Sequence, residues 1–285
     1  MQPVGVFVGA ATLDLHYLVP ETRTRDSKGP ALGFGMYAGG PAANAAVTFA
    51  HLGGAARLWA EVGSHPLGRI IAAELAARGV DLVDLTADSD ALPMVSSIFS
   101  FVESSDRMSV SSHYLDNGVA ESLPGPLPEG AAILLVDGFL RKPCLDAASR
   151  GAAQGIPVVL DAGSWKPVME DLLPMLDVAV CSADFHPPGT STHDEALDYL
   201  QQRGVARVAV TRGAAPILYR DGADIGLVPI AAGPVVDTLG AGDVLHGALC
   251  WFLAAGQPFG TALTEAAAVA TRSCRSFGTR AWMDS

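Results

Sequence analysis

Short apolar segments alternate with amphipathic segments along most of the chain. Apolar runs such as Ile133–Val136 and Val205–Thr211 have the length of buried strands, and Asp194–Arg203 has the periodicity of a helix. A glycine follows several helical segments, for example Gly155 and Gly204, as is common at helix ends. Strands that alternate with helices predict a parallel sheet covered on both faces.

Two segments interrupt this alternation. Leu13–Ala38 is polar and glycine-rich, and Met94–Tyr114 alternates as a two-stranded hairpin with Glu103–Asp106 at its turn. Neither segment fits a crossover between parallel strands. We therefore expect a small β-sheet, or lid, formed by residues 13–38 and 94–114. The remaining core would consist of residues 1–12, 39–93 and 115–285.

Composition and charge exclude several classes of protein. The 285 residues include 18 Lys and Arg against 30 Asp and Glu, a formal net charge of −12, which disfavours a nucleic-acid partner. Apolar residues make up 49% of the chain, which excludes disorder. No apolar run approaches the ~20 residues of a membrane helix. Without a signal-peptide pattern, we expect a cytoplasmic protein with no membrane partner.

The common nucleotide-binding motifs are absent or misplaced. A P-loop needs Gly-Lys followed by Ser or Thr, and none of the three lysines stands in that context. Gly33–Ala38 matches the pattern GxGxxA, but the charged segment Glu21–Pro30 before it cannot be the strand of a Rossmann site. The four cysteines form no CxxC pair, which predicts reduced thiols rather than metal ligands or disulfides.

A glycine-rich turn before an apolar helix carries the strongest chemical signal. The segment Val235–Val244 places Gly240, Ala241 and Gly242 at a helix N-terminus, where free N–H groups and the helix dipole bind anions. A carboxylate at Asp243 would oppose anion binding unless it has another task. Acting as general base towards a hydroxyl is one such task. The alternative is that Asp243 only caps the helix.

A second helix start carries groups suited to a hydroxylated ligand. Gly39 and Gly40 allow a ligand to approach the backbone closely. Asn44, one turn into that helix, offers a donor and an acceptor for neighbouring hydroxyls. Asp14 follows the first strand and is expected at the carboxyl edge of the sheet, where ligands of open α/β sheets bind. A plain turn and helix start is the alternative for the glycine pair.

Together these residues resemble the ribokinase/PfkB superfamily of carbohydrate kinases. Its two signatures correspond to Gly39–Asn44 and Asp237–Asp243, in the expected order. Val210–Gly213 looks like the nucleotide-binding VTxG motif, and Arg78–Asp81 resembles the family's GVD segment. The segment Asp243–Ala248 is similar to the sulfofructose-kinase-like branch. Loss of the Asn and Glu of the family's NxxE motif is similar to what ketohexokinase-like and sulfofructose-kinase-like members show.

The resemblance implies a fold, an activity and a set of site residues. The fold is a three-layer α/β/α sandwich with a mostly parallel central sheet and a small β-sheet lid. The activity is transfer of the ATP γ-phosphate to a primary hydroxyl of a sugar, with Mg²⁺, by a homodimer joined through its lids. Asp243 would be the base, and the Gly240–Gly242 amides would bind the transferred phosphoryl group. The other matched positions are Asp14, Gly39, Gly40, Asn44 and Arg107 for the substrate, Thr211, Gly213 and Ser182 for ATP, and Asp237 and Thr238 for a monovalent cation such as K⁺.

The chain departs from the family pattern at several positions. His65 replaces the Asp of GxDxxG, and Pro216 replaces the last Gly of VTxGxxG. Ser182–Phe185 occupies the place of the NxxE motif, which handles magnesium and phosphate, and Asp184 is a candidate substitute. These changes concern metal affinity and nucleotide geometry.

Two further side chains and two further functions stay open. Asp161, at a strand end, is either a structural cap or a group near the phosphates, and His246 is favoured as a packed helix histidine over a catalytic one. A nucleoside kinase of the adenosine type is an alternative, because Phe34, Tyr37, Phe99 and Phe101 could stack on a base. A silent sugar or nucleotide sensor is the third reading, and an intact anion loop with Asp243 argues against it.

Overall fold

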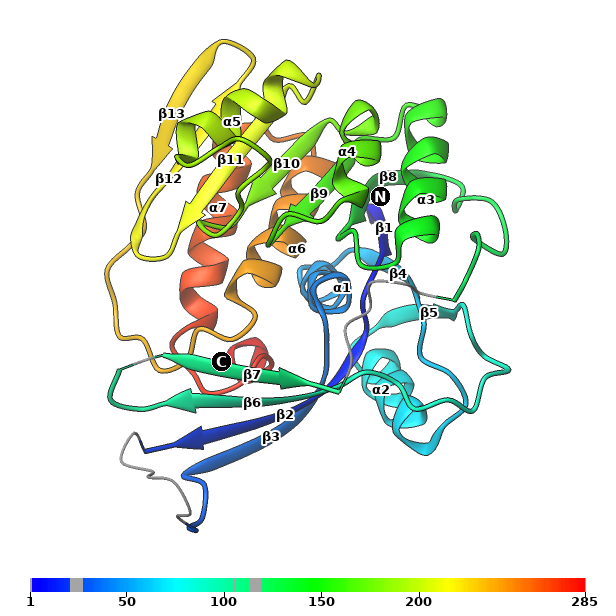
Figure 1. The fold of residues 1–285 in the computed structure, drawn as a ribbon, viewed down its shortest axis with the longest axis vertical. Coiled ribbons are helices and arrows are strands. Elements are labelled where there is room, and N and C mark those ends of the chain that lie inside the picture. Colours follow the sequence, from blue (N-terminus) through cyan, green and yellow to red (C-terminus); the bar gives the residue numbers. More distant parts are fainter. Residues whose placement is uncertain (1, 21–27, 105, 113–118, 285) are drawn as a thin grey trace.

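A large sheet and a small sheet organise the chain (Figure 1). The computed structural model describes residues 2–20, 28–104, 106–112 and 119–284. Within these residues the large sheet has nine strands in the order β13-β12-β11-β10-β9-β8-β1-β4-β5. Its strands are β1 (Val4–Val8), β4 (Ala55–Ala60), β5 (Val80–Asp84), β8 (Ala131–Val136), β9 (Val158–Ala162), β10 (Val178–Cys181), β11 (Arg207–Arg212), β12 (Ala215–Asp221) and β13 (Asp224–Val228).

Helices cover both faces of the large sheet. One layer contains α1 (Pro41–His51), α2 (Pro66–Ala77), α6 (Ala241–Ala254) and α7 (Phe259–Ser273). The other layer contains α3 (Arg141–Gln154), α4 (Val168–Leu172) and α5 (His193–Gln202). Short 3₁₀ turns span Leu173–Met175 and Ala281–Asp284. The predicted three-layer α/β/α architecture is confirmed.

The central strands are buried on both sides. Val6 and Val8 of β1 pack into the α3–α5 layer, whereas Phe7 packs into the layer of α1, α6 and α7. Leu134 and Leu135 of β8 divide between the layers in the same way. This two-sided burial explains why these strands are continuous apolar runs rather than alternating ones.

Strand direction brings the functional loops to one edge of the large sheet. The strands from β11 through β5 pair in parallel, so their carboxyl ends share an edge. Among the described strands of the large sheet, only the pairs β11–β12 and β12–β13 are antiparallel. The pattern did not predict β5, β13 or α4. Strands β5 and β13 lie at the two sheet edges and lack an apolar run, and α4 has only five residues.

The small sheet is built from the two segments that interrupt the alternation. Its strands are β2 (Thr12–Val19), β3 (Gly33–Gly39), β6 (Val95–Phe101) and β7 (Arg107–Ser111), in the order β3-β2-β6-β7. The prediction of a small separate sheet is therefore confirmed. Residues 21–27, 105, 113 and 114 of these segments lie outside the described residues.

The two faces of the small sheet differ in chemistry. Asp14, His16, Ser96 and Ser100 alternate along β2 and β6 and are buried on the inner face. The outer face carries one apolar row across all four strands, formed in register by Phe34, Tyr17, Phe99 and Met108. The Tyr17 ring lies 5.0 Å from that of Phe34 and 5.3 Å from that of Phe99.

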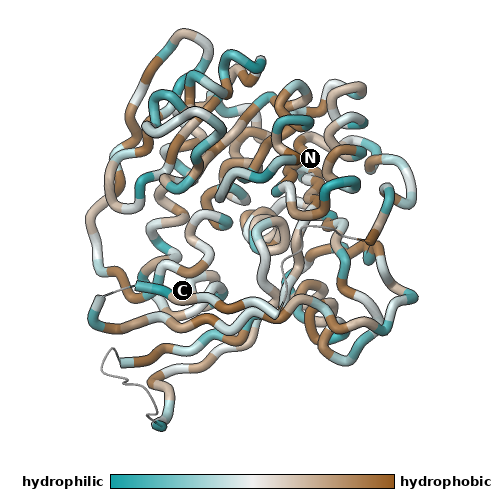
Figure 2. The backbone as a smooth tube through the Cα atoms, in the orientation of Figure 1, coloured by the Kyte–Doolittle hydropathy of each residue, from teal (hydrophilic) through white to brown (hydrophobic). Residues whose placement is uncertain are grey.

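Hydrophobic residues concentrate in the interior of the large sheet and also occur along the small one (Figure 2). On the outer row, the side chains of Phe34 and Met108 are 57% and 49% exposed, so the row is open to solvent in a single chain. Within the described residues, no helix is both long and apolar enough to cross a membrane.

Candidate active site

Polar side chains from distant segments meet between the carboxyl edge of the large sheet and the inner face of the small one. Asn44 of α1 donates its amide Nδ2 to Asp243 Oδ2 of α6 at 2.7 Å. Asp14 of β2 is close enough to Asp243 to raise its pKa. The structure thus brings together Asp14, Asn44 and Asp243, which the sequence assigned to one site.

The N-terminus of α6 has the features of an anion-binding site. Gly240 precedes the helix with φ +72°, a left-handed conformation that favours glycine. No side chain caps this end. The Ala241 amide donates to the Thr238 carbonyl at 3.2 Å, which leaves the amides of Gly242 and Asp243 as the first-turn donors for a ligand. A Cβ on Gly242 would meet no atom of the rest of the chain within 4 Å, so the space beside this residue is open.

Asp243 has the acidity of a general base. Burial is the largest cause that raises its pKa from 3.8 to about 7, and the nearby carboxylate of Asp161 adds to the shift. The hydrogen bond from Asn44 and the neighbouring His246 act in the opposite direction. A carboxylate with a pKa near neutrality holds a proton more strongly than a free one, as proton removal from a hydroxyl requires.

Asp14 and the glycine pair fit together sterically. A Cβ on Gly39 would lie 1.9 Å from Asp14 Oδ2, so only glycine leaves room for this carboxylate. Gly40 has φ +97°, and a Cβ there would lie 2.4 Å from the Ala10 carbonyl oxygen. Burial raises the pKa of Asp14 to about 6, opposed by the hydrogen bond that Thr12 donates at 2.6 Å. The glycine pair thus serves to place Asp14 against the start of α1.

Arg280, which the sequence analysis did not single out, connects this cluster to the rest of the fold. Its side chain is buried and donates to Asn44 Oδ1 and to Glu74 Oε1, both at 2.9 Å, and to the Ala38 carbonyl. Glu74 in turn accepts the Ala38 amide. A continuous chain of hydrogen bonds therefore runs from Glu74 through Arg280 and Asn44 to Asp243. No sequence signal marks Arg280, which lies in the segment after α7.

Asp137 is a second residue that the motifs did not reveal. It follows β8, is buried, and accepts the amides of Ala10 at 2.8 Å and Ala42 at 3.3 Å through Oδ2, and that of Phe139 through Oδ1. It thereby caps α1, the helix that carries Asn44, from another strand. Burial raises its pKa to about 6. The available signal was a lone Asp directly after an apolar strand, the same signal that marked Asp161.

The residues matched to ATP lie on neighbouring strand ends. Thr211 of β11 donates its hydroxyl to the Cys181 carbonyl of β10 at 3.2 Å, and Ser182 donates to the Gly163 carbonyl just after β9. Gly213 follows β11 with φ +60°, and a Cβ there would meet no atom within 4 Å. These positions therefore share the carboxyl edge with the N-terminus of α6. Asp184, the candidate substitute in the NxxE position, is exposed.

The side chains matched to a monovalent cation are engaged by donors of the chain itself. Asp237 Oδ1 accepts from the Leu239 amide at 3.0 Å and from Ser100 at 3.2 Å, and Oδ2 accepts from the Gly278 amide at 2.9 Å. His16 Nε2 lies 3.6 Å from the same Oδ2. A carboxylate has about four acceptor positions, so little of this one is left for K⁺. Asp237 instead joins the small sheet to the segment after α7.

Arg107 and Thr238 are also placed together. Arg107, on β7, donates from Nη1 to Thr238 Oγ1 at 3.5 Å. The small sheet thus contacts the loop before α6 through this pair as well as through Asp237.

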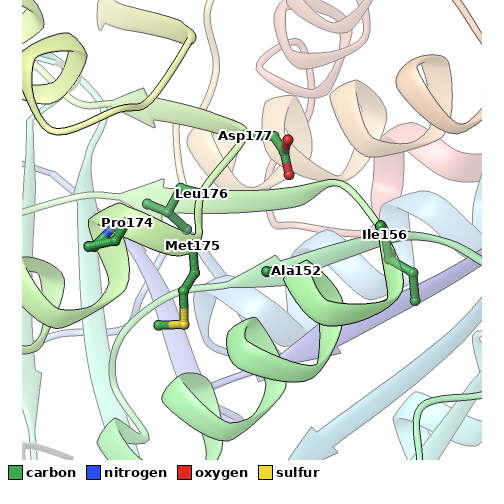
Figure 3. A pocket seen from close by; sticks show the side chains of 7 residues that line it. Ala152, Ile156, Pro174, Met175, Leu176 and Asp177 are labelled. Atoms are coloured by element: carbon green, nitrogen blue, oxygen red, sulfur yellow. The ribbon is translucent and has the colours of Figure 1, made fainter.

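A hollow lies far from this site, and its one carboxylate, Asp177, is already hydrogen-bonded. Figure 3 shows it between the end of α3 and the start of β10, lined by Ile156, Pro174, Met175, Leu176 and Asp177 among others. It lies at the amino-terminal edge of the strands, opposite the cluster around Asp243. The Asp177 carboxylate is already used by the Val158 amide at 2.8 Å.

Comparison with known proteins identifies the family of this chain. The family model for pfkB family carbohydrate kinases matches residues 5–285. The chain belongs to the pfkB family of carbohydrate kinases. The resemblance inferred from the two signatures is thereby confirmed, and so is the expectation that the protein is a kinase.

Solved structures show that the kinase shares its fold with ribokinases. It matches a ribokinase from Arabidopsis thaliana, complexed with ribose and ATP, with 22% identity and a TM-score of 0.76 over 98% of this chain and 94% of the other. The ribokinase of Thermotoga maritima gives 19% identity and a TM-score of 0.75 over 99% and 96% of the two chains. An adenosine kinase from Sinorhizobium meliloti gives 19% and 0.77 over 98% and 95%.

Proposed function

We propose that the kinase transfers the γ-phosphoryl group of ATP to a primary hydroxyl of a sugar or sugar derivative. The observation that carries the proposal is the position of Asp243. Its carboxylate stands beside the uncapped N-terminus of α6 and is held by Asn44 at 2.7 Å. A base and an anion site on one helical turn could act on the attacking hydroxyl and on the transferred phosphoryl group, respectively.

In the proposed reaction, Asp14 and Asn44 bind the hydroxyls of the sugar, and the backbone at Gly39 and Gly40 closes around it. Asp243 takes the proton of the attacking hydroxyl. The amides of Gly242 and Asp243 then bind the charge on the phosphoryl group as it moves. Arg107, on the small sheet, would reach the substrate or its phosphates.

The nucleotide would lie along Ser182, Thr211 and Gly213, at the strand ends next to α6. The ribokinase of Arabidopsis thaliana, whose structure contains ribose and ATP, supports this assignment through its shared fold. Mg²⁺ would be bound mainly by the phosphates of ATP and would neutralise their charge. Among the described residues there is no cluster of three ligating side chains, so we assign no protein ligand to it. Because Asp237 is engaged elsewhere, no step is assigned to K⁺.

We further propose that the small sheet acts as the lid of the site, with the boundaries expected from the sequence. Its inner face supplies Asp14, and closing over the sugar would exclude water that could accept the phosphoryl group. Because the proposed reaction consumes ATP, the proposal also assigns the kinase to the cytoplasm.

A nucleoside substrate is the second candidate, because an adenosine kinase is among the solved structures with a similar fold. The aromatic residues that suggested it do not favour it here. Phe34 and Phe99 lie on the outer face of the small sheet, away from Asp14, and Phe101 follows the same alternation. Tyr37 packs against Gly278, where a Cβ would lie 2.2 Å from the tyrosine Oη. The inner face also carries Tyr37 and Ile98 but is mostly polar around Asp14, and it therefore favours a sugar over a flat base.

The outer row of Phe34, Tyr17, Phe99 and Met108 supports a homodimer joined through the small sheets. An apolar row that crosses four strands and stays exposed in the single chain is the type of surface that a partner covers.

The function is tested by ADP production with purified protein, ATP and Mg²⁺. The substrate panel contains ketoses, aldoses, deoxy sugar acids and nucleosides, each also assayed with the Asp243→Asn variant as control. We expect one sugar class to release ADP well above both the control and the nucleosides. A nucleoside as preferred substrate would establish the second candidate. No ADP release with any member would favour a catalytically silent sensor.

A further inference from the structure

His246 lies one turn beyond Asp243 on α6 and is 4% exposed. Its ring Nδ1 lies 2.8 Å from the Gly242 carbonyl oxygen, and Nε2 lies 3.1 Å from the Val180 carbonyl oxygen of β10. The ring therefore bridges the first turns of α6 and the large sheet, with a carbonyl oxygen at each nitrogen.

Two acceptors require two donors. A neutral imidazole has one N–H, so one of its nitrogens would point a lone pair at a carbonyl oxygen, whereas the protonated ring donates from both. Asp161 supplies the matching negative charge. Its Oδ2, which is buried and accepts no hydrogen bond among the described groups, lies 3.3 Å from Nδ1. A buried carboxylate oxygen without a donor is costly, and a charged ring beside it offsets that cost.

The bond to Gly242 links the ring to the anion site. The Gly242 carbonyl and the Asp243 N–H belong to the same peptide unit. Hydrogen bonds at the two ends of a peptide group polarise one another, so a charged donor on the carbonyl makes the N–H a stronger donor. That N–H is one of the two first-turn amides that the Ala241–Thr238 bond leaves for a ligand.

We propose that His246 donates from both ring nitrogens, with Asp161 as its counter-ion, and acts as a positioning residue that strengthens the phosphoryl-binding amide of Asp243. The catalytic consequence rests on the proposed phosphoryl transfer; the protonation of the ring does not. His246 touches neither substrate in this arrangement and acts through the Gly242–Asp243 peptide.

The ionisable groups around the ring agree with a positive charge. Asp161 of β9 and Asp243 of α6 are carboxylates. Cys181 of β10 and Cys250 of α6 are thiols whose pKa burial raises, so both remain neutral. A positive ring also offsets the electrostatic effect by which Asp161 raises the pKa of Asp243.

The charge is measured directly by long-range ¹H–¹⁵N spectra of the full chain labelled with ¹⁵N-histidine, recorded at pH 8. We expect one histidine with both ring nitrogens in the protonated range, and the exposed His186 serves as the solvent-exposed reference in the same spectrum. The signal is assigned by its absence from His246→Gln, and a His186→Gln variant fixes the reference without touching the core. If every histidine of the wild-type protein shows the neutral pattern at pH 8, the proposal is overturned.

The effect on the reaction is measured with His246→Gln, which keeps a neutral N–H donor but cannot carry charge. We expect kcat to fall roughly tenfold with the sugar KM unchanged, less than the 10²–10³ typical of losing a whole anion-hole donor. Losing the positive charge also raises the pKa of Asp243, so the acid limb of the kcat/KM profile moves to higher pH. An unchanged kcat together with an unchanged acid limb would refute the positioning role, even if the ring proves to be charged.

Discussion

Asn44 donates a 2.7 Å hydrogen bond to Asp243 across 199 positions of sequence. The oxygen of the same amide, Asn44 Oδ1, accepts a hydrogen bond from Arg280 Nη1 at 2.9 Å. Because Arg280 can only donate, it also fixes which way the amide points. The NH₂ group of Asn44 therefore faces Asp243, and one oxygen of the proposed base is held while the other stays available for a hydroxyl.

Replacing the proposed base by its amide separates chemistry from folding. We expect Asp243→Asn to lower kcat by about 10²–10⁴, the usual contribution of a general base, while ATP binding is retained. The melting temperature at pH 8 should not fall, because burial disfavours the charged carboxylate that the variant removes. Coupled ADP assays and thermal melts check both points. A variant with near wild-type kcat would disprove the role of Asp243.

The pH dependence of the reaction follows from the raised pKa of Asp243, about 7. Below that value the carboxyl is protonated and cannot accept the hydroxyl proton, so kcat/KM should fall about tenfold per pH unit and level off above it. The sign for stability is opposite. The unfolded group ionises near 3.8, so this group's contribution to folding declines as the pH rises from about 4 to about 7. A flat rate profile from pH 5 to 8 would contradict the assignment.

Filling the space at Gly242 tests the anion site. A Cβ there meets no atom of the chain within 4 Å, so Gly242→Val should fold normally. The side chain would instead keep the phosphoryl group from the first-turn amides and lower kcat by about 10²–10³. Gly125→Val, at another open position far from the site, is the matched control and should keep full activity. A variant that only raises the sugar KM would argue against an anion site at Gly242.

The hydrogen-bond chain through Arg280 should couple stability to catalysis. Arg280→Lys keeps the charge but cannot reach Glu74, Asn44 and the Ala38 carbonyl together. Losing a hydrogen bond between this buried side chain and the charged Glu74 costs about 1.5–3 kcal/mol, and kcat should fall as Asn44 loses its fixed orientation. Denaturant unfolding and steady-state assays measure the two effects.

The control for Arg280 is Arg78→Lys. Arg78 lies 3.7 Å from the exposed Asp284 and is itself partly exposed, so its change should stay within about 0.5 kcal/mol. Equal effects of the two substitutions would contradict a role of the hydrogen bonds from Glu74 to Asp243 in stability and catalysis.

The outer row of the small sheet should hold two copies together. Light scattering of the wild-type kinase at micromolar concentration should give twice the 29.4 kDa of one chain. Phe34→Lys combined with Met108→Lys places two charges on the row and should give a monomer. Ile225→Lys, on the exposed strand β13, is the matched control and should leave the dimer intact. A wild-type monomer would disprove the pairing.

Most of the proposed site was predictable because its residues sit next to features with local signals. Gly240 and Gly242 precede an apolar helix, and Gly39 and Gly40 precede another, so helix-terminal chemistry can be inferred from the chain alone. Arg280 and Asp137 have no such neighbours. Their importance comes from contacts over 236 and 95 positions, to Asn44 and Ala42, which a local pattern does not contain.

The aromatic residues of the small sheet show the same limit. The sequence allowed Phe34 and Phe99 to stack on a substrate or to form an exposed face, because strand alternation separates two faces without saying which one is inside. The register of β2 with β3 and β6 decides the question by placing both rings in one row with Tyr17, opposite Asp14.

The sequence by itself determined the layered architecture, the interrupted segments that form the small sheet, and the two glycine-rich helix starts. These properties depend on periodicity and on backbone conformations that few residues adopt, and both are local. Only the tertiary structure decided that Asp237 is engaged by Ser100 and Gly278, that Arg280 orients Asn44, and that both nitrogens of His246 face carbonyl oxygens. A buried polar group takes its charge and its role from whichever donors and acceptors the fold brings to it, and those lie on other elements of the chain.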